Sequence, residues 1–315
     1  MKKLLIPLVL FLVAATGINF KPTAGCKIYR NHAPIVLRNK HYVVISGDSI
    51  AGGIHNCIKL INCDHIRITN CKLMTTTKDS AFGVYINNCS NIQVDNNYIA
   101  NVALGVLALN SKHINVTQND MLNMKNSGGG SFVVFANISG AQNRITKNHC
   151  ENLLGSSIAD IGIDIAFSTG FSFSPIYIQG NYIRGYGTMK DGAGIRLADG
   201  GGSWQVAQDN ILVNVGTNGI LIDSGRHISV INNKVFSKQI AHVSYAGIRV
   251  INPLTPFSVT VTGNKIKWRD SGNTERDTIF LSKHPTGYLL NTLSASQDST
   301  LLPVQLLNRC NHVGF

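Results

Sequence analysis

A short pattern returns in register along most of this 315-residue chain. The segments 35–48, 58–71, 84–97 and 106–119 each contain a stretch of alternating apolar and polar residues, a polar turn, and a second alternating stretch. Alternation with a period of two is typical of β-strands that have one buried face. A single copy has nothing against which to bury that face, so the copies must stack on one another. The repeat therefore predicts a solenoid of β-strands.

Three columns of residues recur in this pattern. The second strand of each copy ends at Asp48, Cys71, Asn97, Asn119, Asn148, Asn181, Asn210, Asn233 and Asn264. The first strand opens at Cys57, Gly83, Gly105, Gly162, Gly194, Gly219 and Gly247. The turn between the strands holds Asn39, Asn62, Asn88, Asn110, Asn137 and Asn252. We interpret the recurring Gly and Asn as residues that tolerate positive φ in turns, and we expect the end-column amides to form a ladder along the stack.

The uneven spacing of the copies favours a right-handed parallel β-helix of about nine coils, because its turns can expand into loops. Propellers need longer four-stranded repeats, left-handed β-helices need strict hexapeptides, and a sandwich gives no reason for a pattern to return in register. The pattern resembles the pectin-lyase-like superfamily over about residues 34–268. That resemblance implies a fold shared by polysaccharide lyases, polygalacturonases, uronate epimerases, phage tailspikes and non-catalytic surface proteins. The diagnostic motifs of the polygalacturonases and mannuronan epimerases are absent from the sequence.

The two ends of the chain depart from the repeat. Residues 1–17 have a basic start, an apolar stretch and small residues, as in a secretory signal peptide, and the apolar stretch is short for a membrane anchor. We expect residues 18–33 to cap the N-terminal end of the β-helix at 34–268, and 269–315 to form a C-terminal cap or tail. Export predicts a secreted, periplasmic or cell-surface protein without stable membrane insertion.

The charge of the chain suggests a partner. The formal net charge is +12, and removal of Lys2 and Lys3 with the leader lowers it to +10. A basic exported protein can meet an anionic polysaccharide, whereas no Lys/Arg run or familiar motif indicates nucleic acid. Solubility alone is the alternative explanation of the excess lysines. The oligomeric state is not predicted.

A candidate site lies in the column two residues after each strand-opening position. That column reads Lys59, Tyr85, Leu107, Val134, Asp164, Arg196, Leu221 and Arg249. Its second half gathers ionisable groups, and further ones lie on the same or flanking turns: Asp160, Arg184, Tyr186, Lys190, Asp191, Asp199, Asp223 and Tyr245. We predict catalytic roles for Asp164, Lys190, Arg196 and Tyr245, and substrate-binding roles for Tyr186, Asp191, Asp199 and Arg249.

Two chemistries fit these residues. In β-elimination of a uronate, Arg196 and Arg249 would neutralise the carboxylate while Lys190, Tyr186 or Tyr245 moves protons. In hydrolysis, Asp164 would pair with Asp191 or Asp199 as acid and base or nucleophile. We predict β-elimination in preference to hydrolysis, and no metal residue is assigned, although a cluster of four Asp could hold Ca²⁺. The alternative is a non-catalytic carbohydrate-binding or cell-surface protein, in which Asp164 and Arg196 form only a cross-strand ion pair.

The histidines and cysteines have simpler explanations within the repeat. His65, His113 and His227 share one turn position, which predicts turn residues rather than catalysts. Most of the seven cysteines fall at positions of the repeat that are expected to be buried, where a thiol packs as a small apolar group. The alternative for two of them is a Cys63–Cys89 bond, because these residues share a column on adjacent coils.

Overall fold

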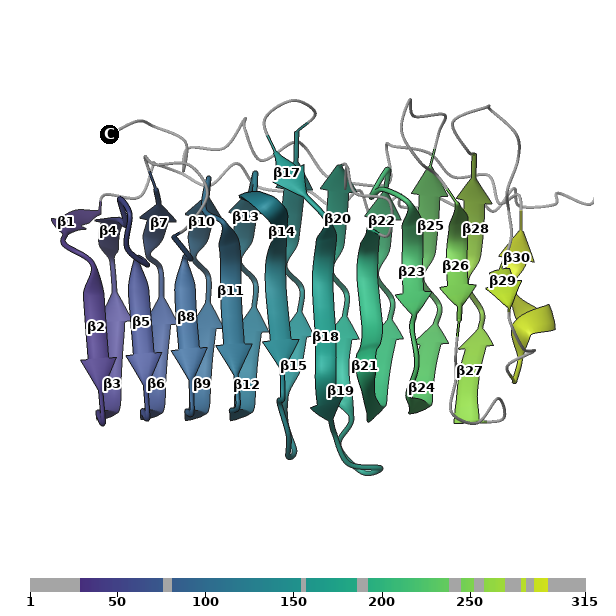
Figure 1. Cartoon of the computed structure of the whole chain (residues 1–315), viewed down its shortest axis with the longest axis horizontal. Helices are drawn as coiled ribbons and strands as arrows, with labels where there is room; N and C mark the ends of the chain where they lie inside the picture. Colours follow the sequence, from purple (N-terminus) through teal and green to yellow (C-terminus); the bar gives the residue numbers. More distant parts are fainter. Residues whose placement is uncertain are drawn as a thin grey trace, which may run out of the picture.

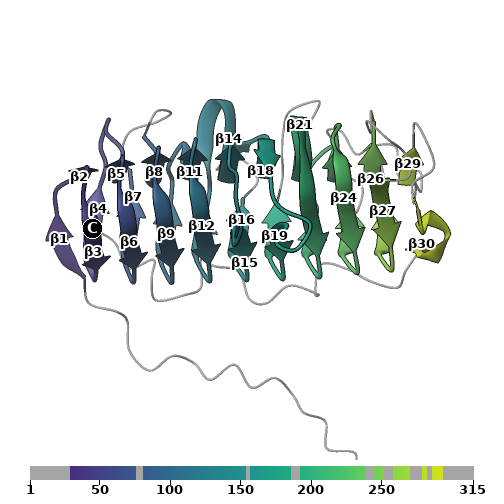
Figure 2. The ribbon, with the colours of Figure 1, turned by 90° about the horizontal axis from the view of Figure 1, so that it is seen from below.

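The computed structural model describes residues 29–75, 81–153, 157–185, 192–237, 245–251, 258–269, 279–281 and 286–293. The signal-like residues 1–17, the expected cap up to residue 28, Cys26 and Cys310 lie outside these ranges. The described residues form a parallel β-helix, seen as one rod along the long axis (Figures 1 and 2). The all-β solenoid expected from the repeat is confirmed.

Each coil contributes a strand to three faces of the rod. The first face contains β2 (Ile35–Arg38), β5 (Ile58–Ile61), β8 (Val84–Asn87), β11 (Leu104–Leu109), β14 (Lys125–Ala136), β18 (Ile161–Thr169), β21 (Ala193–Gln208), β23 (Asn218–Ile222), β26 (Ala246–Val250) and β29 (Ile279–Leu281). The second face contains β3 (His41–Ser46), β6 (Asp64–Thr69), β9 (Ser90–Asp95), β12 (Lys112–Thr117), β15 (Arg144–Thr146), β19 (Ile176–Gln179), the end of β21, β24 (Arg226–Ile231) and β27 (Val259–Thr262).

The third face is an eleven-stranded sheet. It contains β1 (Arg30–His32), β4 (Asp48–Ala51), β7 (Lys72–Met74), β10 (Tyr98–Ala100), β13 (Asp120–Leu122), β16 (His149–Asn152), β20 (Tyr182–Gly185), β22 (Ile211–Val213), β25 (Lys234–Ser237), β28 (Lys265–Trp268) and β30 (Thr292–Leu293). A short β17 (Ile158–Ala159) pairs with β14, and a 3-10 helix η2 spans Tyr288–Leu290. Parallel pairing thus continues beyond residue 268, through β26–β29 and β28–β30.

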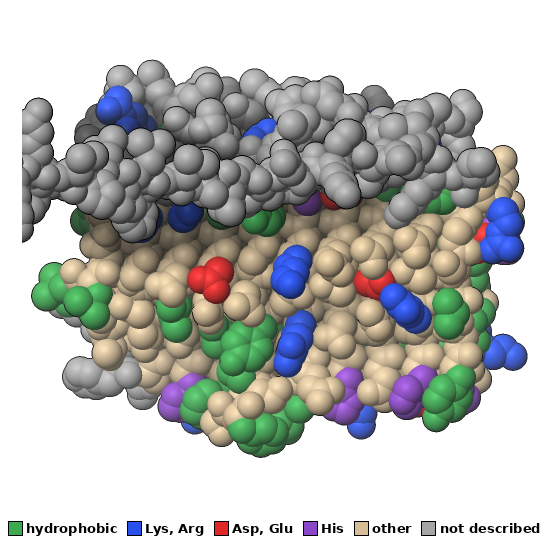
Figure 3. All heavy atoms as spheres, turned by 180° about the vertical axis from the view of Figure 1, so that it is seen from behind, with side chains coloured by type: hydrophobic (Ala, Val, Ile, Leu, Met, Phe, Trp, Pro, Cys, Tyr) green, Lys and Arg blue, Asp and Glu red, His purple; other side chains and the backbone are tan. Residues whose placement is uncertain are grey.

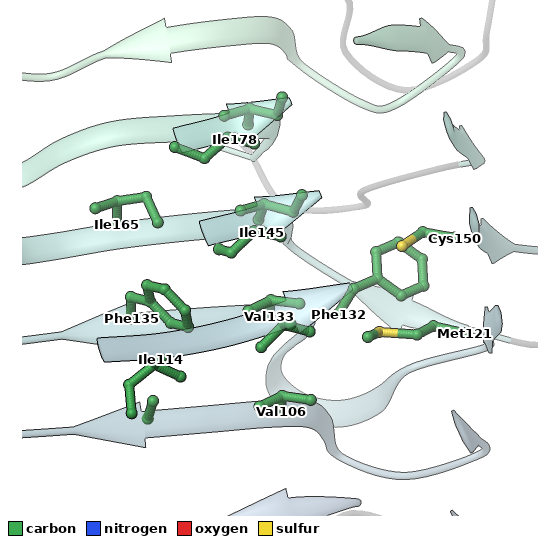
Figure 4. Close-up of a cluster of buried hydrophobic side chains, with 14 of the residues drawn as sticks. Val106, Ile114, Met121, Phe132, Val133, Phe135, Ile145, Cys150, Ile165 and Ile178 are labelled. Carbon is green, nitrogen blue, oxygen red and sulfur yellow. The ribbon is translucent and has the colours of Figure 1, made fainter. Parts of the chain in front are cut away.

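Inward-facing aliphatic side chains stack along the axis to form the core. Ile145 of β15 pairs with Ile178 of β19, and both are fully buried. In Figure 4 they lie one above the other, while Phe132 lies between Met121 and Cys150. Burial of each such side chain contributes about 1.5–3 kcal/mol, so the alternation seen in the sequence is the main reason why the coils stack.

An amide ladder lies at the corner between the second and third faces. Each Asn donates from Nδ2 to Oδ1 of the next, over 2.8–3.0 Å, through Asn97, Asn119, Asn148, Asn181, Asn210, Asn233, Asn264 and Asn291. The expected ladder is confirmed, and Asn291 adds a member that the sequence pattern did not reveal. The conformational explanation was wrong for this column: its members are not positive-φ residues. The residue before each member from Asn97 to Asn264 is one, as at Asn96 and Asn232.

The strand-opening glycines are also explained by space rather than by φ. None of Gly83, Gly105, Gly162, Gly194, Gly219 and Gly247 has a positive φ. A Cβ on Gly83, Gly162 or Gly219 would collide with the backbone carbonyl of the next glycine in the column. The column therefore keeps successive coils close at this corner. Positive φ is confirmed for the turn asparagines Asn39, Asn62, Asn88, Asn110 and Asn137.

The histidines and cysteines behave as the repeat predicts. His65, His113 and His227 share a positive-φ turn position, with φ of 54–55°. Cys57, Cys63, Cys71, Cys89 and Cys150 are buried and free, so Cys63 and Cys89 form no disulfide. Burial raises the pKa of Cys57 to about 12, which keeps this thiol protonated and unreactive.

Candidate functional site

The outward-facing column of the first face has the register that the sequence predicts. Lys59 pairs with Tyr85, Tyr85 with Leu107, and Leu107 with Val134. The column continues through Val134–Asp164 and Asp164–Arg196. It ends with Arg196–Leu221 and Leu221–Arg249. Neighbouring members are therefore one strand spacing apart, about 4.8 Å, although they are 22 to 32 residues apart in the chain.

Arg196 is the centre of an acid cluster, by which we mean Asp164, Arg196, Asp199 and Asp223. Nη2 of Arg196 lies 2.7 Å from Oδ1 of Asp199 and 2.7 Å from Oδ2 of Asp223. Asp199 follows Arg196 on β21, and Asp223 follows the end of β23 on the next coil. Among the described residues, no ion pair joins Arg196 to Asp164. The cross-strand pair considered from the sequence is thus replaced by two other pairs.

A bulge in β21 accounts for this difference. The register between β18 and β21 shifts after Asp164, and Ala198 has a φ of 53°. Buried Gln205 stabilises the bulge, because its Oε1 accepts from the Ala198 amide at 2.9 Å and its Nε2 donates to the Ser168 carbonyl at 2.8 Å. The bulge sets Asp199 opposite Ala166 rather than on the regular continuation of the strand. Gln205 is thus a positioning residue for the cluster.

Asp164 has the most strongly perturbed carboxyl group of the cluster. Burial is the main cause that raises the pKa of Asp164 to about 7. The negative charges of Asp199, Asp160 and Asp223 raise this pKa further, and the positive charge of Arg196 lowers it. The buried Oδ1 of Asp164 has no hydrogen-bond partner among the described residues. Burial and the neighbouring carboxylates therefore leave about half of the Asp164 carboxyl groups protonated at pH 7, where an ordinary aspartate is fully ionised.

The other members of the cluster are also perturbed. Burial raises the pKa of Asp199, as do the charge of Asp223 and a hydrogen bond with it, whereas Arg196 lowers it. Burial alone would lower the pKa of Arg196, but the hydrogen bond to Asp223 and the three surrounding carboxylates raise it. The guanidinium is therefore permanently charged, and both carboxylates of Asp199 and Asp223 compete for one of its nitrogens.

Tyr245 and Arg249 form a separate contact farther along the column. The guanidinium carbon of Arg249 lies 4.5 Å from the centre of the Tyr245 ring, and 45% of Tyr245 is exposed. Arg249 is two strand spacings from Arg196, or about 10 Å. The structure therefore brings Asp164, Arg196 and Asp199 together, and leaves Tyr245 and Arg249 as a neighbouring pair.

Three other predicted site residues, Tyr186, Lys190 and Asp191, lie outside the described residues. Within the part of the chain that is described, no three His, Cys, Asp or Glu side chains are grouped closely enough to hold a metal ion. The sequence places Asp223 on a flanking turn and predicts no role for it. The feature that could have indicated a role is its position directly after a strand of the first face, one coil beyond Arg196.

The family of the chain follows from its repeat. The family model described as a right-handed β-helix region matches residues 35–235. The chain belongs to the right-handed β-helix family. No curated protein matches this β-helix protein. Over the ranges that the structure describes, none of its helices has the length and apolarity that crossing a membrane requires.

Three solved structures show the range of proteins that this β-helix protein is similar to. The enzymatically active domain of tailspike protein 2 of bacteriophage CBA120 is 14% identical, with a TM-score of 0.39, over 80% of this chain and 41% of the tailspike. The catalytic domain of a GH87 α-1,3-glucanase is 11% identical, with a TM-score of 0.38, over 77% of this chain and 54% of the glucanase. PfbA, a surface adhesin of Streptococcus pneumoniae, is 10% identical, with a TM-score of 0.37, over 75% of this chain and 76% of the adhesin. At these identities the likeness concerns the fold alone.

Proposed function

We propose that this β-helix protein is a glycoside hydrolase and that its acid cluster cleaves the glycosidic bond. The buried carboxyl group of Asp164 carries this proposal. With a pKa raised to about 7 and a buried Oδ1 that has no hydrogen-bond partner within the described part of the chain, Asp164 is suited to protonate the oxygen of the leaving sugar. A structural aspartate would instead be ionised and hydrogen-bonded.

The second carboxylate that hydrolysis requires comes from the pair at Arg196. Asp199 and Asp223 each lie 2.7 Å from the same guanidinium nitrogen, so the positive charge favours an ionised form of this pair. The ionised carboxylate acts as base or nucleophile, and Arg196 keeps it oriented. Hydrolysis with one protonated and one ionised carboxyl group matches the general plan of glycoside hydrolases.

The same contacts weigh against β-elimination at this place. A lyase would use Arg196 to neutralise a uronate carboxylate, but that guanidinium already faces two carboxylates. A third carboxylate from the substrate would be repelled by them. Export of the enzyme is proposed on the signal-like residues 1–17 alone.

The test is a panel of polysaccharides incubated with the purified full chain, with new reducing ends and unsaturated-uronate absorbance measured together. We expect reducing ends without absorbance, and a loss of about 10²–10⁴-fold in rate for Asp164→Asn, as for removal of a general acid. Absorbance that rises with the reducing ends would replace hydrolysis by β-elimination. If no polysaccharide of the panel is cleaved, the hydrolase proposal fails and a non-catalytic binding role replaces it.

The pH profile of the reaction tests the role of Asp164 more narrowly. A general acid must be protonated, so we expect kcat/KM to decline as the pH rises through about 7, the pKa to which burial raises Asp164. An alkaline limb several pH units higher would assign the acid to another group.

A further inference from the structure

Three exposed phenylalanines stand at the edge where β18 passes to β19. The exposed fractions are 61% for Phe167, 44% for Phe171 and 81% for Phe173. The rings of Phe171 and Phe173 are stacked, with centroids 5.3 Å apart and planes inclined by 23°. The connection that carries them projects below the edge of the rod (Figure 1). Exposure of several aromatic rings to water is unfavourable, so such a group indicates a binding surface.

The loop that carries the pair is held by the coils on both sides. Phe171 and Ser174 exchange two backbone hydrogen bonds of 3.0 Å. The Gly170 amide donates to the Ser203 carbonyl on the following coil at 3.0 Å. The Gln142 amide, on the preceding coil, donates to Ser174 Oγ at 2.8 Å. The two rings are therefore presented by a preorganised backbone, which lowers the entropy lost on binding.

The segment that carries the pair favours an uncharged partner with hydroxyl groups, although Arg144 on the preceding coil pairs with Tyr177 of β19. No Asp, Glu, Lys, Arg or His occurs in residues 165–183, which carry both rings, while Ser172, Ser174 and Thr169 supply hydroxyls. A membrane-surface site would have basic residues among its aromatic ones. A stable contact between two copies would bury about 800 Å² on each, more than a pair of rings provides. The apolar C–H face of a pyranose, ringed by hydroxyls, fits such a surface.

Phe167 lies on β18 between the acid cluster and the loop that carries the pair. Phe167 follows Asp164 by three residues on β18, which corresponds to about 10 Å. The Phe167 ring lies against Gly200, where any Cβ would collide with it, and Gly200 directly follows Asp199. A chain of sugars bound at the cluster thus has an aromatic path across the edge of the rod, transverse to its axis.

We propose that Phe171 and Phe173 stack against a pyranose ring of an uncharged glycan. The inference deepens the proposed hydrolase and rests on it for the link to cleavage, because it names an uncharged polysaccharide as the substrate class. Phe171 and Phe173 would hold a sugar unit that is remote from the bond cleaved at the acid cluster. Phe167 lies between the cluster and the loop that carries these two rings.

The experiment measures retention in affinity gel electrophoresis with soluble β-glucan, xylan, mannan and, as the anionic comparison, polygalacturonate. All proteins carry Asp164→Asn, so that no glycan is consumed. We expect the Phe171→Ala/Phe173→Ala variant to bind an uncharged glycan about tenfold more weakly, because stacking and apolar burial are both lost. Replacement of both residues by Tyr should retain binding.

The matched control is Tyr42→Ala. Tyr42 is also exposed, at 77%, and stacks on His65 at 4.7 Å on the same edge of the rod, far from the acid cluster. It should leave retention unchanged, and thermal unfolding should show that all variants are folded.

Several results would overturn the proposal. One is equal retention of the double Ala variant and its parent, another is an equal loss in Tyr42→Ala, and a third is retention by polygalacturonate alone. A dimer of the parent in light scattering that the double variant abolishes would make the surface a contact between copies. If binding depends on the two rings but the wild-type chain hydrolyses no glycan, the stacking site is supported and the proposed hydrolase activity is contradicted.

Discussion

The amide ladder and the acid cluster both hold polar groups away from water, but they differ in charge and in how many of their hydrogen bonds are formed. Ladder residues are neutral, alike, and bonded on both sides; Asn181, for example, is fully buried and makes side-chain hydrogen bonds to Asn148, Ile145 and Asn210. The cluster combines one guanidinium with three carboxyl groups, and one buried oxygen of Asp164 has no hydrogen-bond partner in the ranges that the structure describes. Satisfied polar groups stabilise a fold, whereas unsatisfied ones persist where function requires them.

Removal of a ladder residue should have the largest effect on stability. Asn181→Ala removes the acceptor of the Asn148 amide and side chain, each at 3.0 Å, and the donor to Ile145 and Asn210. We expect a loss of about 3–6 kcal/mol, because buried partners are left unsatisfied. Urea unfolding followed by circular dichroism measures it. The control is Asn137→Gly, an exposed turn residue with a φ of 55°; equal effects of the two would remove the special role of the ladder.

Asp164→Asn should do the opposite and stabilise the chain. Because the pKa of Asp164 is raised in the folded state to about 7, ionisation is easier in the unfolded state, and the wild-type chain loses stability as the pH rises from about 4 to about 7. The neutral amide is free of this loss, so the variant should gain roughly 2–4 kcal/mol at pH 8 and little at pH 4. Melting temperatures at the two pH values test this. A variant that is less stable at pH 8 would make Asp164 a structural residue.

Arg196→Gln isolates the positive charge of the cluster. Asp199 and Asp223 would lose their shared partner, and ionisation of the cluster would become less favourable. We expect a loss of about 1–3 kcal/mol at pH 8 and a smaller loss at pH 5, where the carboxyl groups take up protons. Thermal unfolding at both pH values measures the difference. A loss that does not depend on pH would show that the side chain acts through packing.

Arg67→Gln should have the smallest effect. Arg67 makes two 2.9 Å hydrogen bonds to Asp95 on the second face, but its side chain is 49% exposed. Asp95 keeps Thr69 and Asn96 as partners. The expected loss is about 1 kcal/mol, because the half-exposed guanidinium contributes little and the buried Asp95 carboxylate keeps two other donors. Urea unfolding of Arg67→Gln and Arg196→Gln, measured side by side, tests this order. A larger loss of stability in Arg67→Gln than in Arg196→Gln would contradict it.

The side of the rod opposite to that seen in Figure 1 carries few charged groups. Figure 3 looks onto the side opposite to that in Figure 1, and uncharged polar groups and backbone dominate it, with only scattered Lys, Arg, Asp and Glu. Histidines lie along one edge in that view. The net charge of the whole chain therefore says little about the local charge at the acid cluster, where carboxyl groups outnumber the guanidinium.

What could be predicted from the sequence follows the regularity of the repeat. The column that brings Asp164 next to Arg196 was predicted, because strand register repeats with the pattern. The pairing of Arg196 with Asp199 and Asp223 was not, because it depends on a bulge at Ala198 that breaks the alternation. Asn291 was missed because the coil that leads to it carries little of the strand pattern. The glycine column was recognised, but its cause is contact between coils rather than local conformation.

The amide ladder has one consequence for how such a chain changes over generations. Every interior member both gives and receives the same hydrogen bond, so any member can follow any other. Duplication or deletion of one whole coil would leave two ends that join without a mismatch. A protein of this design can therefore vary in length by units, and lengthen the surface beside the acid cluster, while the cluster itself stays intact on its own three coils.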